Sequence, residues 1–145
     1  MILLRLILGT VFVISSWSKL RYPRIFAEAL LAYQVLPDNL VTVVAVVLPW
    51  LELLAGLAVL LGYRSRGSSL VLGGLSLLFA IVLSSAVWKG LDISCGCFVG
   101  VEWMTVKWWH IAANLIFACM AGAVFVRGPG RWAIESRPRV NQVRA

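Results

Sequence analysis

Four long apolar segments dominate the sequence and limit the folds that it can adopt. These segments cover residues 2–20, 40–62, 68–88 and 108–126. A helix rises about 1.5 Å per residue, so about 20 residues cross the ~30 Å hydrocarbon core of a bilayer. Only 13% of the residues are charged, against about 25% in ordinary soluble domains. The sequence therefore predicts an all-α integral membrane protein, a four-transmembrane-helix bundle that forms one domain over residues 1–126.

The first apolar segment is the shortest, and a cleaved signal peptide is its alternative interpretation. Trp17 and Lys19 lie where the small residues of a cleavage site would be needed, which argues against cleavage. Arg5 lies near the start of the segment, so we expect its long side chain to reach the lipid headgroups. We predict a membrane span here.

The segment between the first two spans, residues 22–36, mixes polar and apolar residues. Pro23 suits the first position of a helix. Four apolar side chains roughly share one face of that helix, namely Ile25, Phe26, Leu30 and Tyr33. We predict a short interfacial helix, or a folded-back extension, after the first span.

The distribution of Lys and Arg predicts the orientation in the membrane. With four spans, the N-terminus, the loop at 63–67 and the C-terminal tail lie on one side. That side holds Arg5, Arg64, Arg66, Arg127, Arg131, Arg137, Arg139 and Arg144, and the other holds Lys19, Arg21, Arg24, Lys89 and Lys107. Since positive charge concentrates in the cytoplasm, we expect a bacterial inner-membrane protein with cytoplasmic termini, a basic cytoplasmic tail at 127–145 and an extracytoplasmic loop at 89–107. The net charge of +7 then reflects topology and contact with anionic lipid, and no nucleic-acid partner is expected.

The loop at 89–107 contains two cysteines separated by one glycine. Cys95 and Cys97 would lie in an oxidising compartment, where a thiol pair can cycle with a disulfide. Gly96 gives the backbone freedom to close so small a ring, and the strain of that ring makes the disulfide easier to reduce. Nearby lysines and the start of the fourth helix favour the thiolate, whereas Asp92 opposes it. The pattern predicts an exchange-active pair.

Two other interpretations of the pair stay open, half of a metal site and two unreactive loop cysteines. Only His110 and Cys119 could add metal ligands, so we predict no metal. Cys119 lies deep in the fourth span and is expected to be a small buried filler. His110 begins that span and is expected to form hydrogen bonds at the interface; an axial haem ligand or a base for the thiols are its alternatives.

Glu52 lies near the middle of the second span, where a carboxyl group is costly unless it is neutral or paired. We expect it to be protonated, or paired with a hydroxyl, Asn114 or Lys19. Pro49 lies one turn earlier and predicts a kink beside it. A structural partner inside the bundle and a proton-linked or ligand-binding role are both compatible with this position.

The cysteine segment resembles the Cys-Gly-Cys-Phe-Gly signature of the MauE branch of the DoxX-like membrane proteins. Here Val99 separates Phe98 from Gly100, which adjoin in the family pattern. Other landmarks of the family are present at Gly9, Phe12, Ser15, Lys19, Leu20, Tyr33, Leu36, Pro37, Leu48, Pro49, Glu52, Gly56 and Gly62. The likeness covers about residues 3–126.

The resemblance implies a four-helix bundle that takes part in disulfide chemistry outside the cytoplasm. MauE-like proteins are associated with methylamine utilisation, where they are thought to act with a thioredoxin-like partner in maturing a disulfide-rich amine dehydrogenase subunit. We carry over the thiol exchange at Cys95 and Cys97 and leave the client protein open. The alternative is a non-catalytic accessory subunit of a larger membrane complex. No cofactor is expected, since the sequence has no motif for nucleotide or hydrolytic chemistry.

Overall fold

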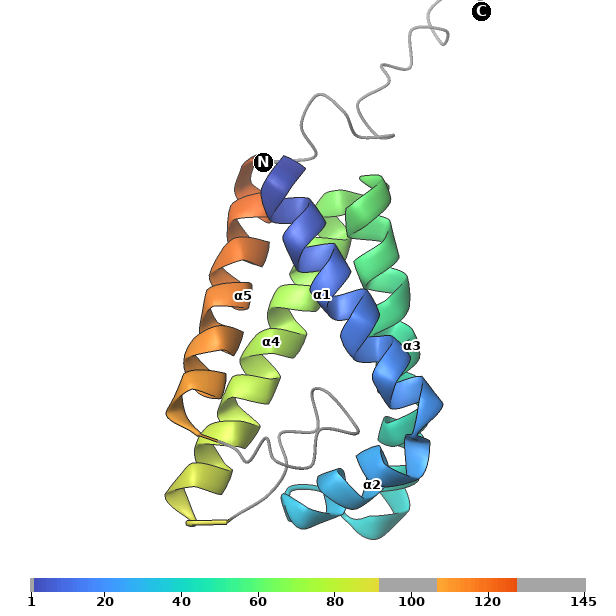
Figure 1. The fold of residues 1–145 in the computed structure, drawn as a ribbon, viewed down its shortest axis with the longest axis vertical. Coiled ribbons are helices and arrows are strands. Elements are labelled where there is room, and N and C mark those ends of the chain that lie inside the picture. The colour runs from blue at the N-terminus through green and yellow to red at the C-terminus, as the bar shows by residue number, and fades with distance from the viewer. Residues whose placement is uncertain (1, 92–106, 128–145) are drawn as a thin grey trace, which may run out of the picture.

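The computed structural model describes residues 2–91 and 107–127, and these ranges form five α-helices (Figure 1). The helices are α1 (Ile2–Arg21), α2 (Pro23–Ala32), α3 (Asp38–Leu61), α4 (Ser65–Trp88) and α5 (Trp108–Arg127). Of these, α1, α3, α4 and α5 are long and apolar enough to cross a membrane. The predicted all-α fold with four transmembrane helices is therefore confirmed.

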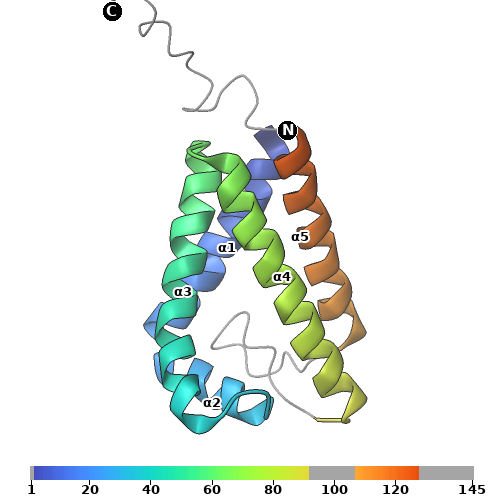
Figure 2. The ribbon, with the colours of Figure 1, turned by 180° about the vertical axis from the view of Figure 1, so that it is seen from behind.

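The four long helices form two antiparallel pairs, α1 with α3 and α4 with α5 (Figures 1 and 2). One end of the bundle holds the start of α1, the turn between α3 and α4, and the end of α5. The opposite end, which we call the α2 end, holds α2, the end of α4 and the start of α5. The loop at 92–106 lies outside the described residues, but Leu91 and Lys107, which flank it, both lie at the α2 end.

The buried side of α1 follows a seven-residue spacing. Its buried residues are Arg5, Leu8, Gly9, Phe12, Ser15, Ser16 and Lys19. Residues at this spacing form a stripe along one side of an α-helix, and that stripe faces the neighbouring helices. Leu8 and Phe12 pack in a central core with residues of α3, α4 and α5. Arg5 and Lys19 lie on the same buried side of α1, nearer its two ends.

α2 is the short helix predicted after the first span, and it begins at Pro23. It packs against α3 and α1. Phe26, Ala29 and Tyr33 are buried, whereas Ile25 is 45% exposed. Our expectation that Ile25 shares one face with Phe26 and Tyr33 was wrong, because consecutive helical residues such as 25 and 26 point about 100° apart.

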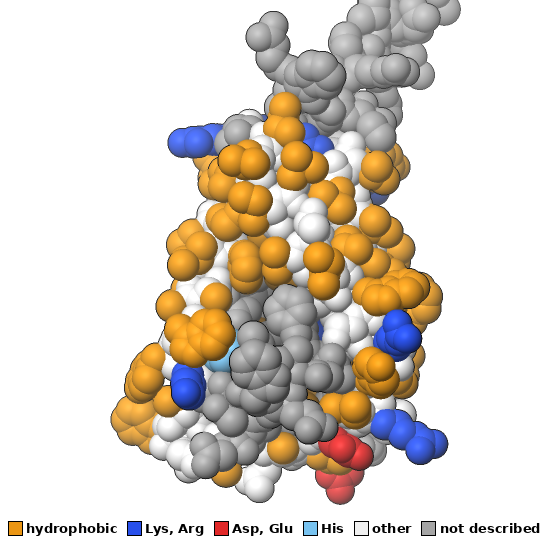
Figure 3. All heavy atoms as spheres, viewed as in Figure 1, with side chains coloured by type: hydrophobic (Ala, Val, Ile, Leu, Met, Phe, Trp, Pro, Cys, Tyr) orange, Lys and Arg blue, Asp and Glu red, His pale blue; other side chains and the backbone are white. Residues whose placement is uncertain are grey.

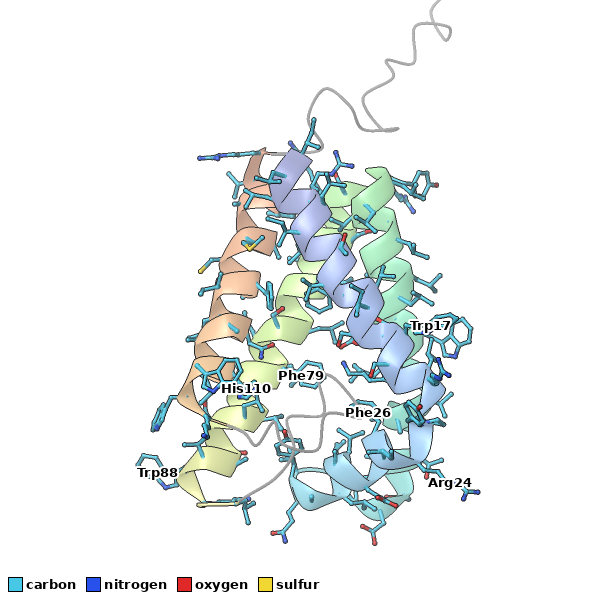
Figure 4. All side chains as sticks on the ribbon, viewed as in Figure 1. Trp17, Arg24, Phe26, Phe79, Trp88 and His110 are labelled. Atoms are coloured by element: carbon cyan, nitrogen blue, oxygen red, sulfur yellow. The ribbon has the colours of Figure 1, made fainter. Side chains whose placement is uncertain are left out.

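The outer surface is what a lipid-embedded bundle requires. Figure 3 shows apolar side chains over the body of one face, with Lys and Arg nearer its two ends. At the α2 end, Trp88 is 92% exposed and Trp108 is 75% exposed, and Figure 4 shows Trp88 and Trp17 projecting outward. Exposed tryptophans of this kind are typical of the membrane–water interface.

Candidate functional site

A buried ion pair joins α1 to α3 inside the bundle. The Lys19 ammonium donates to both carboxylate oxygens of Glu52, at 2.7 Å to Oε2 and 3.0 Å to Oε1, and each side chain is only 1% exposed. Ser16 lies beside the carboxylate, and its hydroxyl donates to the carbonyl of Phe12 one turn back. Of the partners expected for Glu52, Lys19 is therefore confirmed. Asn114 is not one, because its amide donates to the His110 carbonyl at 3.0 Å.

Two aromatic rings enclose the ammonium group of this pair. The Lys19 Nζ atom lies 5.3 Å from the centroid of the Phe26 ring and 4.8 Å from that of Phe79. Figure 4 shows both rings inside the bundle, one from α2 and one from α4. Each ring attracts the cation through its π face while it excludes water. Four helices thus contribute to this site: α1 and α3 supply the two ions, and α2 and α4 supply the two aromatic rings.

The energetic cost of burying a charge explains why Lys19 and Glu52 occur as a pair. A single charge in this environment is costly, and removing one partner of a buried pair typically costs about 3–5 kcal/mol. The pair is close to neutral as a whole and is satisfied by short charge-assisted hydrogen bonds. Phe26 and Phe79 also line an apolar cavity of about 110 Å³ between α2, α3 and α4. The arrangement places a buried polar centre directly beside an apolar pocket.

Arg5 forms a second buried polar contact between α1 and α3, at the other end of the bundle. Its Nε atom donates to the Val59 carbonyl at 3.1 Å and its Nη2 atom to the Leu60 carbonyl at 3.3 Å. Our expectation that Arg5 reaches the headgroups was wrong, since it is only 4% exposed. The Val59 carbonyl also accepts from the Gly62 backbone N–H, so Arg5 adds a second donor there and provides one to the Leu60 carbonyl in the last turn of α3.

His110 is buried in the first turn of α5, near the α2 end. Its Nδ1 atom accepts a hydrogen bond from the Lys107 backbone N–H at 3.1 Å. Its Nε2 atom is buried and has no partner within the described part of the chain. The ring lies against Trp109, with 3.9 Å between centroids. The predicted hydrogen-bonding role is thus confirmed for one ring nitrogen.

The predicted thiol site can be located only by its flanks. Asp92, Cys95, Gly96 and Cys97 lie outside the described residues. Cys119, expected to be buried, is exposed on α5, because positions 117, 120, 121 and 124 supply the inward side of that helix. Within residues 2–91 and 107–127, no three His, Cys, Asp or Glu side chains gather to hold a metal.

Sequence reasoning found the ions of the site but not the rings. Phe26 and Phe79 were anticipated only as apolar residues, and nothing local marks them as partners of a cation. Arg5 could have been found, because Arg5, Phe12 and Lys19 are spaced seven residues apart and so lie on one face of α1.

Comparison with known proteins identifies the family. The family model described as methylamine utilisation protein MauE matches residues 1–127. The methylamine utilization protein MauE of Paracoccus denitrificans is 32% identical over 122 residues, which are 83% of this chain and 66% of that protein. No solved structure matches the chain. The chain, a multi-pass membrane protein with a buried ion pair at its centre, therefore belongs to the MauE family.

Proposed function

We propose that this protein carries out thiol–disulfide exchange through Cys95 and Cys97 on the extracytoplasmic side of the bacterial inner membrane. The observation that carries the proposal is the Cys-Gly-Cys segment itself, which lies within the residues matched by the family model. The loop that contains it is flanked by Leu91 and Lys107 at the α2 end. A compartment outside the cytoplasm sustains such a disulfide.

The proposed partner is an extracytoplasmic thioredoxin-like protein. A thiolate of the reduced partner attacks one sulfur of the Cys95–Cys97 disulfide and forms a mixed disulfide, and the partner's second thiol then resolves it. The partner is oxidised to a disulfide, and the two cysteines are reduced to thiols by the same two electrons. The reverse exchange with an oxidised partner restores the disulfide, so the reduction potentials set the direction.

The bundle supports this role by holding the loop's two ends in place. α4 and α5 are packed together, and near the loop Leu83 and Ala86 of α4 share a buried cluster with Ile111 of α5, with Leu91 packed against it. The named relative is a methylamine utilization protein. We propose that the exchange serves the maturation of a disulfide-containing protein in methylamine utilisation.

Cysteine alkylation tests the proposal directly. Membranes are treated with a maleimide carrying a polymer tag, before and after reduction with dithiothreitol. We expect two tags to be added only after reduction, and Cys119→Ser, the matched control, to leave this difference unchanged. Cys95→Ser or Cys97→Ser should abolish it and accumulate a mixed disulfide with a small thioredoxin-like protein.

Two results would contradict the proposal. One is full tagging of Cys95 and Cys97 without reductant. The other is unchanged oxidation of the partner in the Cys95→Ser/Cys97→Ser variant. Purification of that variant in an unchanged, stoichiometric large complex would instead support the accessory-subunit alternative.

A further inference from the structure

An open groove lies between α3 and α4 at the end of the bundle opposite α2. Its volume is about 590 Å³. The residues that line it include Leu51, Leu54, Arg64, Arg66 and Val71. Figure 2 shows α3 and α4 meeting at their tight turn and spreading apart below it. The groove therefore opens beside the α3–α4 turn and continues down the membrane-spanning part of α3.

The mouth of the groove is positively charged. Arg64 and Arg66 are both exposed, and neither forms a salt bridge with the described residues. The acidic side chains described are Glu52, which pairs with Lys19, and Glu28 and Asp38, which lie at the α2 end. Arg5 is at the same end as the groove but turns inward to the carbonyls of α3. Nothing described at this end neutralises the two arginines.

The floor of the groove is apolar and extends to the middle of the membrane. Leu51 is 42% exposed, Leu54 63% and Val71 37%. Leu51 lies ten residues before the end of α3 at Leu61, a depth of about 15 Å at 1.5 Å per residue. This is half of the ~30 Å hydrocarbon core. The groove is thus cationic at its mouth and apolar below it, and its depth matches the thickness of one leaflet of the hydrocarbon core.

We propose that this groove is a binding site for one anionic phospholipid. The guanidinium groups of Arg64 and Arg66 bind the phosphate, which suits their planar, multidentate donors. The start of α4 adds the favourable potential of a helix N-terminus for an anion. One acyl chain lies along Leu51, Leu54 and Val71. A soluble phosphate compound would use only the mouth, whereas the apolar floor is explained by a lipid.

Lipid titration of the purified full-length chain tests this site. The chain in detergent is titrated with phosphatidylglycerol or phosphatidylcholine, and the lipid-bound fraction is measured by native mass spectrometry. We expect one tightly bound phosphatidylglycerol and weaker binding of phosphatidylcholine. Arg64→Gln/Arg66→Gln should weaken phosphatidylglycerol binding at least about tenfold, as expected for two lost contacts to an anionic headgroup. The control Arg21→Gln/Arg24→Gln, at the α2 end, should bind as the unchanged chain does.

A second pair of variants tests the apolar floor and leaves the arginines intact. Val71→Trp should fill the groove and reduce binding, whereas Leu70→Trp, on an exposed neighbouring position of α4, should not. Glycerol 3-phosphate should fail to displace the lipid. The proposal is overturned if glycerol 3-phosphate displaces it fully, which would indicate a soluble phosphate ligand. Equal binding by the Arg64→Gln/Arg66→Gln and control variants, or by the two tryptophan variants, would also overturn it.

Discussion

Two basic residues on α1 are buried, and each is satisfied in a different way. Arg5 donates to the Val59 and Leu60 carbonyls in the last turn of α3, where a cation is also favoured by the helix dipole. Lys19 is neutralised by Glu52 and enclosed by two aromatic rings. Both residues therefore connect α1 to α3. A charged residue in an apolar span is usually interpreted first as part of a functional site, but both charges here have structural partners.

The ion pair leads to a prediction about stability. Lys19→Met leaves the Glu52 carboxyl group buried without its cation, so we expect a loss of about 3–5 kcal/mol in the free energy of unfolding. The double variant Lys19→Met/Glu52→Met should be clearly more stable than the sum of the single variants indicates, because it removes both charges. Unfolding in mild detergent, followed by circular dichroism, measures these differences.

Arg24→Met and Glu28→Met provide the control for this cycle. Both residues are exposed on α2 and lie one turn apart, so their effects should be small and their coupling no more than about 0.5 kcal/mol. Additive effects of the Lys19 and Glu52 substitutions, or losses no larger than those of the α2 variants, would show that the buried pair does not hold the bundle together.

At the scale of the elements, α1 and α3 pack closely at Gly9 and Gly56. A Cβ atom added at Gly9 would clash with Leu60 Cγ and lie 2.9 Å from the Gly56 carbonyl oxygen. A Cβ atom added at Gly56 would lie 3.2 Å from Val13 Cγ2 and 3.3 Å from the Gly9 carbonyl oxygen, which is also tight. Small residues are what allow membrane helices to approach so closely. The position of both polar contacts of α1 depends on this approach.

Gly9→Ala is therefore expected to separate α1 from α3. The added methyl group meets backbone as well as the Leu60 side chain, so a loss of about 1–3 kcal/mol is expected. Gly74→Ala is the matched control, because nothing lies within 4 Å of its added Cβ, and it should be neutral or stabilise by up to ~1 kcal/mol. Thermal unfolding of both variants in detergent tests this; equal stability would contradict the close contact.

At the scale of the whole molecule, the two ends of the bundle differ. Among the described residues, the end with the α3–α4 turn carries Arg64, Arg66 and Arg127 and no acidic side chain, whereas the α2 end mixes Lys, Arg, Glu and Asp. With four spans, eight Lys and Arg residues of the sequence belong to the side of the α3–α4 turn and five to the α2 side, and such an excess favours the cytoplasmic side. We therefore predict that the α2 end, with the flanks of the cysteine loop, faces outward.

Labelling of single cysteines tests this orientation. In a chain whose native cysteines are replaced by serine, Asn39→Cys places a thiol at the α2 end and Gly67→Cys places one at the opposite end. Both positions are exposed and neither change alters a charge. We expect a membrane-impermeant maleimide to label Asn39→Cys in intact spheroplasts and Gly67→Cys only after lysis. The reverse pattern would place the cysteine loop in the cytoplasm and remove the basis of the redox proposal.

Residue patterns predicted only part of the candidate site. Burial of a carboxyl group in a span requires a partner, so Glu52 could be predicted to pair and Lys19 could be named among its partners. The choice between Lys19 and Asn114 could not be made, because it depends on which helices are neighbours. Phe26 and Phe79 were out of reach for the same reason, since their role requires α2 to fold back over α1 and α4 to approach from the other side.

The sequence by itself determined the membrane environment, the number of spans and the short helix after the first one. These follow from the length of apolar runs and from local signals such as Pro23, which act within one segment. Only the tertiary structure decided that Arg5 turns inward, that Cys119 is exposed and that Lys19 meets Glu52 between two rings. Hydrophobicity places a helix in the bilayer but does not orient it there, because lipid and a neighbouring helix are similarly apolar; packing and the pairing of buried charges select the inward face.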